Sequence, residues 1–197
     1  MNAAPSASAE QIRRRNRFVL LAIFALFFGS LLFAGALRFS GWRPPGTKAH
    51  GELLQPPGDL RGVVPRLVNG DAYHWNPSQR IWRIALAPPA DCTIACERLA
   101  RQIDTVWQLM GQESDHVQVL WIGSAPAIAM HGGALQVMQP SSMLLAQLPR
   151  LQPTAGEPPH DVPVYIIDPN GFVILRYAPG FDPSGLRTDL ATLTKLM

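Results

Sequence analysis

Cysteine is scarce in this chain of 197 residues, which has two, Cys92 and Cys96. One pair cannot form the framework of disulfides that holds together small secreted domains. Two cysteines four residues apart can nevertheless face each other around a first helical turn, where they can close one disulfide or present two thiolates to one metal ion. A purely structural disulfide is the alternative, but the ring that it closes is so short that it would stabilise the fold little.

The sequence also lacks the motifs of several large enzyme classes. It contains no Ser/His/Asp nucleophile elbow, no phosphate-binding glycine loop and no paired-carboxylate motif. Any chemistry is therefore expected to centre on the two cysteines.

Net charge is absent outside the N-terminus. Residues 1–17 contain four Arg and one Glu, which account for the whole formal charge of +3. Residues 18–197 have equal numbers of acidic and basic side chains, whereas a nucleic-acid-binding domain normally presents a basic face. We therefore expect no nucleic-acid partner.

Charged side chains are missing from residues 18–37, a run of 20 residues rich in Leu, Phe and Ala. A helix of this length covers about 30 Å, the hydrocarbon thickness of a bilayer. Because each backbone amide must be paired inside the segment within lipid, we expect a transmembrane helix. A cleaved signal peptide is the alternative, since Ala34-Gly35-Ala36 resembles a cleavage site. The run is longer than the apolar region of a usual signal peptide, which favours a retained anchor.

Basic side chains are concentrated before this run. Four arginines lie within residues 1–17, whereas Arg38, Arg43 and Lys48 are spread more thinly after the run. The positive-inside bias then predicts that residues 1–17 form a cytoplasmic basic arm. Residues 38–197 are expected on the other side of the inner membrane, in the periplasm.

Proline and glycine are frequent in residues 38–60. Both residue types interrupt helices and strands, so we expect a linker there, followed by a globular domain at residues 61–197. Asn69-Gly70 between apolar residues predicts a hairpin. The remaining apolar patterns predict an α/β domain of three layers with a central mixed sheet. The expected strands are 81–87, 117–122, 164–167 and 172–177, and the expected helices are 97–110, 142–148 and one that starts at Asp182-Pro183.

The cysteine pair falls between the end of an expected strand and the start of an expected helix, where open α/β sheets place ligand sites. The free N–H groups and the positive dipole end of the helix stabilise a thiolate, so at least one cysteine should be more reactive than a free thiol. His160 precedes a strand that should run beside the cysteine-bearing strand, and it is a third candidate ligand. Two thiolates and an imidazole suit Cu(I), while two sulfurs alone support dithiol–disulfide exchange.

The globular domain resembles the Sco/SenC family of thioredoxin-like copper proteins, which assist assembly of the copper centre of cytochrome c oxidase. The resemblance covers about residues 61–197, and an N-terminal anchor is also typical of that family. It implies a thioredoxin-like fold and copper ligands Cys92, Cys96 and His160. Four stretches carry it in the same order: the Asn69-Gly70 hairpin with the Trp82 strand, the Cys92–Cys96 pair, His160 with the strand and turn at 164–171, and the C-terminal helix.

A second resemblance lies at the start of the domain. The stretch Gly51-Glu52-Leu53-Leu54-Gln55-Pro56 and the dipeptide Asp91-Cys92 are similar to segments of small transmembrane proteins associated with cytochrome oxidase genes in proteobacteria. Those proteins are themselves similar to Sco proteins.

These resemblances imply a first hypothesis, a membrane-anchored periplasmic protein that binds copper or keeps copper-site thiols reduced during assembly of cytochrome c oxidase. Its partners would be the oxidase or its assembly factors. A second hypothesis is a metal-free thioredoxin-like dithiol–disulfide oxidoreductase that uses Cys92 and Cys96. A third is a non-catalytic assembly or scaffold subunit with a degenerate thioredoxin fold.

Overall fold

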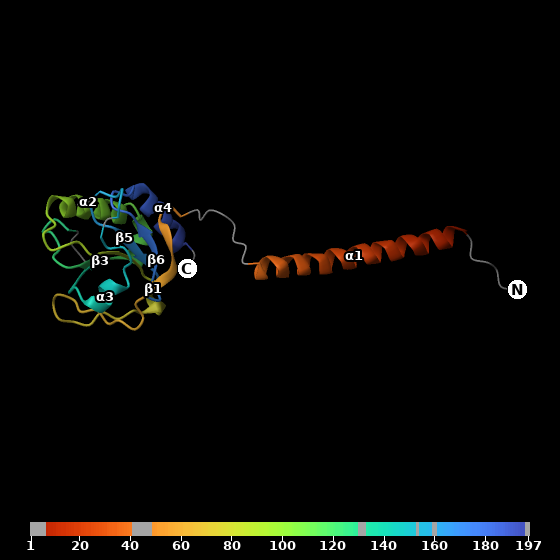
Figure 1. Cartoon of the computed structure of the whole chain (residues 1–197), viewed down its shortest axis with the longest axis horizontal. Helices are drawn as coiled ribbons and strands as arrows, with labels where there is room; N and C mark the ends of the chain where they lie inside the picture. The colour runs from red at the N-terminus through yellow and green to blue at the C-terminus, as the bar shows by residue number, and fades with distance from the viewer. Residues whose placement is uncertain (1–6, 41–48, 130–132, 153, 159–160, 196–197) are drawn as a thin grey trace. The chain divides into compact units, whose positions relative to one another are not determined.

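The computed structural model describes residues 7–40, 49–129, 133–152, 154–158 and 161–195. The chain divides into two units, residues 1–46 and residues 47–197. The first unit is built around the helix α1 (Ala7–Phe39), drawn in red and orange in Figure 1. Its segment Gln11–Phe39 contains an 18-residue window with a mean hydropathy of 2.5 and is long and apolar enough to cross a membrane. The expected N-terminal apolar helix is therefore confirmed.

Six strands of the second unit form one sheet in the order β1-β6-β5-β2-β3-β4. The β2, β3 and β4 strands are parallel to one another, whereas β5 is antiparallel to β2 and to β6, and β1 is antiparallel to β6. The sheet is thus mixed, as the sequence predicts. The strands are β1 (Glu52–Asp59), β2 (Trp82–Leu86), β3 (Val117–Ile122), β4 (Leu135–Met138), β5 (Val164–Ile167) and β6 (Phe172–Tyr177).

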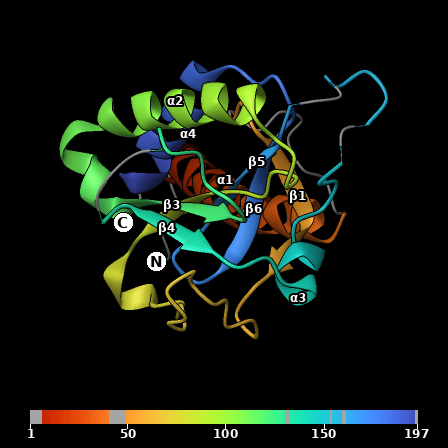
Figure 2. The ribbon, with the colours of Figure 1, turned by 90° about the vertical axis from the view of Figure 1, so that its left-hand side faces the viewer.

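Helices cover both faces of this sheet. Figure 2 shows α2 (Ile94–Gln108) and α4 (Pro183–Thr194) on one side and the short α3 (Ser142–Ala146) on the other. Side chains alternate along each strand, so Ile84 of β2 packs under α2 and α4 while Ala85 packs on the α3 side. Two apolar cores result, one on each face, and the expected three-layer α/β architecture is confirmed.

Two strands differ from the sequence expectation. The β1 strand lies within residues 38–60, which the sequence predicts to be a linker. It tolerates Pro56, Pro57 and Gly58 because it is the edge strand of the sheet and its pairing with β6 is irregular between Leu53 and Gly58. The β4 strand lies in a stretch that gave no strand signal, and it is defined by its parallel pairing with β3.

The remaining elements lie close to their predicted positions. The hairpin at Asn69-Gly70 closes through an antiparallel bridge between Arg66 and Ala72, and Gly70 adopts a φ of 93°, which glycine favours. Helix α2 starts at Ile94, three residues earlier than the apolar spacing suggests. Its first turn therefore includes Cys96.

Candidate functional site

Cys92 and Cys96 are joined in a disulfide, with their Cα atoms 5.6 Å apart. Cys92 lies in the loop that follows β2 and is half-buried, whereas Cys96 lies in the first turn of α2 and is 1% exposed. The two sulfurs are thus unequally accessible. An incoming thiolate can reach the Cys92 sulfur, whereas the surrounding protein shields the Cys96 sulfur from attack.

The loop before the pair is shaped by local sequence. Pro88 and Pro89 come just after Ala87, the residue that follows β2, and prevent the strand from continuing, since proline cannot donate to a sheet ladder. The Cys92 amide then donates to the Pro89 carbonyl at 3.1 Å. Thr93 is the N-cap of α2, but its side chain makes no capping hydrogen bond. The backbone N–H groups of the first turn are therefore not occupied by the Thr93 side chain. They lie at the end of the helix that carries the two sulfurs, where they favour the thiolate form of a cysteine over the thiol form.

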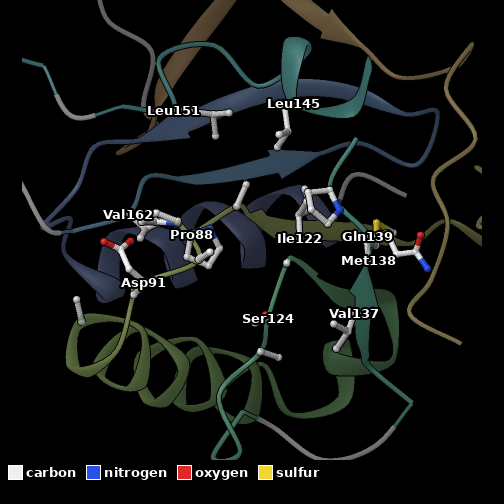
Figure 3. Close-up of a pocket in the computed structure, with 18 of the residues that line it drawn as sticks. Pro88, Asp91, Ile122, Ser124, Val137, Met138, Gln139, Leu145, Leu151 and Val162 are labelled. Atoms are coloured by element: carbon white, nitrogen blue, oxygen red, sulfur yellow. The ribbon is translucent and has the colours of Figure 1, made fainter. Parts of the chain in front are cut away.

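The disulfide borders a cavity of about 1460 Å³ at the carboxyl ends of the parallel strands β2, β3 and β4. We call this cavity the strand-end groove. Its walls are mostly apolar, and Figure 3 shows Leu145 and Leu151 on one side of it, facing Pro88 and Ile122. Asp91 and Gln139 lie toward opposite ends of the groove in that view. The groove occupies the place at which open α/β sheets bind ligands.

The segment before β5 reaches the same groove. Strand β5 pairs antiparallel with β2, so Asp161 and Val162, just before β5, line the groove together with Cys92. Asp161 also forms an ion pair with Arg98 of α2. The predicted adjacency of the two strands is therefore confirmed.

His160 itself lies outside the described residues, so its distance from the sulfurs stays a prediction. Among the residues that the structure describes, no group of three His, Cys, Asp or Glu side chains could hold a metal ion. His160 is the predicted third ligand of a metal site with Cys92 and Cys96. Such a site would require the disulfide to be reduced first, because both sulfurs are used in it.

A buried ion pair fixes the chain shortly before His160. Arg176 of β6 is 2% exposed and donates two hydrogen bonds to the Glu157 carboxylate, at 2.9 and 3.0 Å. These hydrogen bonds, together with one from the Thr154 amide, lower the pKa of Glu157 to about 2. The pair joins the segment that leads to β5 to the neighbouring strand β6.

A second polar cluster lies at the entrance of the domain. The buried carboxylate of Asp189, on α4, accepts hydrogen bonds from the backbone amides of His50 and Gly51 at 2.8 and 2.9 Å and from the Tyr177 hydroxyl at 2.5 Å. The His50 ring nitrogen Nδ1 lies 3.0 Å from the same carboxylate. Burial raises the pKa of Asp189, but the hydrogen bonds from Tyr177, Gly51 and His50 outweigh it and lower that pKa below its usual value.

Arg83 of β2 is a third buried polar residue, at 1% exposed. Its guanidinium donates to the Tyr73 hydroxyl at 2.6 Å and to the Ile81 carbonyl at 2.9 Å, and it lies 5.2 Å from the centre of the Trp75 ring. Burial raises the pKa of Tyr73 above its usual value. The arginine within an otherwise apolar strand is the signal by which sequence reasoning could have found this cluster.

Comparison with known proteins places the domain in a family. Residues 82–197 match the profile of a family described as "Transmembrane-like, thioredoxin-like, C-terminal domain". The comparison with curated proteins gives no match.

Several solved structures share the fold. BsSco, described as a Sco-family cytochrome c oxidase assembly protein with a disulfide switch, is 12% identical; the match covers 75% of this chain and 95% of that chain, with a TM-score of 0.50. Copper-bound ScoI of Arabidopsis thaliana is 13% identical over 76% of this chain and 100% of that chain, with a TM-score of 0.50. A SCO1/SenC family lipoprotein of Bacillus anthracis is 15% identical over 71% and 98%, with a TM-score of 0.50. The expected Sco-like thioredoxin fold is therefore confirmed.

Proposed function

This chain belongs to the transmembrane-like, thioredoxin-like C-terminal domain family, and from that membership we propose that it is a membrane-anchored dithiol–disulfide protein that keeps copper-site thiols reduced during assembly of cytochrome c oxidase. The observation that carries this proposal is the disulfide between the accessible Cys92 and the buried Cys96 at the mouth of the strand-end groove. An unequal pair at a helix entrance is suited to exchange because one sulfur can be attacked while the other leaves.

The exchange proceeds in two steps when the reduced pair acts on a disulfide of a partner. The Cys92 thiolate attacks one sulfur of that disulfide, which forms a mixed disulfide and releases the partner's other sulfur as a thiolate. The Cys96 thiolate then attacks Cys92, closes the internal disulfide and releases the partner's second thiolate. The partner gains two electrons and two protons, and the pair loses them. A dithiol protein on the same side of the membrane would reduce the pair again.

The proposal includes the placement of the chain. Helix α1 would anchor the protein in the inner membrane with residues 1–17 in the cytoplasm and the thioredoxin-like domain in the periplasm. That compartment permits disulfides.

Copper binding is a second candidate function, and the shared groove wall favours it. Asp161 and Val162 line the groove with Cys92, and His160 directly precedes them in the sequence. Reduced Cys92 and Cys96 together with His160 would form a soft set of two thiolates and one imidazole, which suits Cu(I). The Sco-family structures named above include a copper-bound one, which is consistent with this candidate.

Redox titration of the full-length protein in detergent tests the first function. In mixtures of oxidised and reduced dithiothreitol, thiol trapping should report one two-electron transition between the disulfide and the dithiol. Cys92→Ser and Cys96→Ser should each abolish it. A pair that stays oxidised in an excess of reduced dithiothreitol would contradict the proposal.

A further inference from the structure

The strand-end groove is large and open compared with the site of a small substrate. Its volume of about 1460 Å³ exceeds the roughly 300–1,000 Å³ of most small-molecule pockets. It runs past the ends of three adjacent strands, and the disulfide forms part of its wall. A polypeptide segment would fill such a groove better than a small thiol would.

Exposed apolar side chains border the groove at two places, one beside Cys92 and one beside strand β4. Ile94, which lies between the two cysteines in sequence, is 78% exposed, and Val68 is 61% exposed. Both line the groove. Apolar side chains at this level of exposure gain from being covered, so the groove favours an occupant that brings one apolar side chain close to Cys92 and another to the β4 side of the groove.

The charged side chains in the described lining of the groove are acidic. Asp91 and Asp161 are the ionisable side chains among the described residues that line it, apart from the disulfide-bonded Cys92. Asp161 is neutralised by its ion pair with Arg98, whereas Asp91 has no side-chain partner in the part of the chain that the structure describes. An unpaired carboxylate directly before Cys92 repels acidic thiols such as glutathione and attracts a basic side chain.

The outer edge of the sheet beside the groove is already occupied. The Val68 amide donates to the Val137 carbonyl of β4 at 3.0 Å, and the Gln139 amide donates to the Arg66 carbonyl at 2.8 Å. A partner segment therefore cannot add to β4 as a further strand at these positions. It would instead lie across the strand ends, over Cys92.

We propose that the strand-end groove binds an extended polypeptide segment whose cysteine is flanked by apolar side chains and a basic side chain, with the basic group at Asp91 and the apolar groups at Ile94 and Val68. This inference rests on the proposed function and gives its substrate class. In the direction that is simplest to measure, a thiolate of the segment attacks the Cys92 sulfur of the oxidised protein. A mixed disulfide forms, the Cys92–Cys96 bond breaks, and Cys96 leaves as a thiolate that takes up a proton.

Three synthetic peptides of equal length test the proposal on the oxidised full-length protein in detergent. Each has a single cysteine: the first carries Leu, Val and Lys beside it, the second replaces Lys by Glu, and the third replaces Leu and Val by Ser and Gly. The mixed disulfide is quantified by acid quench and mass spectrometry. Each rate is divided by the rate of the same peptide with a neutral small-molecule disulfide, which removes differences in thiol reactivity.

We expect the Lys peptide to react about tenfold faster than the Glu peptide at low ionic strength, with the ratio falling as salt is added. The Ser/Gly peptide should react several-fold more slowly than the Lys peptide. Asp91→Asn should reduce the Lys-to-Glu ratio, and Ile94→Ser should remove the advantage of the apolar peptides.

Two control variants separate these effects from general surface changes. Asp115→Asn removes an exposed carboxylate away from the groove, and Leu109→Ser removes a side chain that is 58% exposed just beyond the end of α2. Both should leave all three rates unchanged. If dithiothreitol reduces the pair but the three peptides react alike, or the Glu peptide reacts fastest, the substrate class is wrong while the proposed function stands. If neither dithiothreitol nor any peptide reduces the pair, both are wrong.

Discussion

Val164, the first residue of β5, pairs directly with Leu86, the last residue of β2. Because the two strands are antiparallel, the chain that enters β5 lies at the same end of the sheet as the start of the loop that leads from β2 to Cys92. Leu86 and Val164, 78 positions apart in the sequence, are thereby neighbours at one end of the sheet. A substitution of His160, which precedes β5 in the sequence, therefore tests whether this residue is a copper ligand.

Cu(I) titration of the full-length protein is the first measurement that we propose. The reduced wild-type protein should bind one Cu(I) ion, the oxidised protein none, and Cys92→Ser none, because two thiolates supply the main donors. His160→Ala should weaken binding by about tenfold or more, since it removes the imidazole donor. His74→Ala is the matched control, because His74 is exposed and lies outside the groove lining. Equal copper affinity of the His160→Ala variant and the wild type would remove His160 from the ligand set.

The Asp189 cluster predicts a large loss of stability from one substitution. Asp189→Ala leaves the amides of His50 and Gly51 and the Tyr177 hydroxyl without their acceptor. Because unsatisfied buried donors cost about 1–3 kcal/mol, we expect the free energy of unfolding to fall by roughly 2–4 kcal/mol in urea titrations. Asp115→Ala, at an exposed position, should change it by less than about 0.5 kcal/mol. A similar result for both variants would show that the cluster contributes nothing specific.

Gly58 predicts a steric effect at the edge strand. A Cβ atom at Gly58 would lie 2.2 Å from the Gln147 carbonyl oxygen, a backbone atom that cannot move aside without shifting the end of α3. Gly58→Ala should therefore destabilise the domain by about 1–3 kcal/mol, measured by the same urea titration.

The control for this prediction is Gly62→Ala. A Cβ atom at Gly62 meets no atom within 4 Å, so that variant should have nearly wild-type stability. If Gly58→Ala and Gly62→Ala had equal stability, the close contact between Gly58 of β1 and the Gln147 carbonyl at the end of α3 would be wrong.

The Glu157–Arg176 pair predicts a dependence of stability on pH. The pKa of Glu157 is about 2 in the folded protein, below its ordinary value near 4.5, so the folded state favours the ionised carboxylate. Its contribution is complete above pH 4.5 and is lost as the pH falls through about 2. We therefore expect the difference in unfolding free energy between the wild type and Glu157→Gln to be constant at neutral pH and to shrink between pH 4.5 and 2. Glu113→Gln should show no such trend.

Much of the architecture follows from local sequence. Apolar spacing and proline positions predict β2, β3, β5, β6 and α4 because each of these elements buries a regular pattern of side chains. The β1 strand cannot be predicted in this way. Pro56, Pro57 and Gly58 are tolerated in a strand only at the edge of a sheet, and which strand lies at the edge depends on the strand order of the whole sheet. The β4 strand has four residues, too few for a pattern to be recognised, and its existence depends on β3.

The site shows the same division. The cysteines and their position at a helix entrance can be predicted because both are properties of one short stretch. The strand-end groove cannot be predicted in this way, because its walls come from seven separate stretches of the chain. The role of His50 was also missed: its backbone amide and ring both contact Asp189, and no spacing between residues 139 positions apart indicates this.

The clamp at Asp189 has a mechanical consequence. His50 is among the first described residues of the second unit, and the chain before it continues to α1. A pulling force on that connection would arise if the protein moved toward or away from a bilayer. The hydrogen bonds from His50 and Gly51 to Asp189 of α4 would resist this force before the edge strand does. The sheet and the sulfur pair, which follows the inner strand β2, would keep their shape under such a pull.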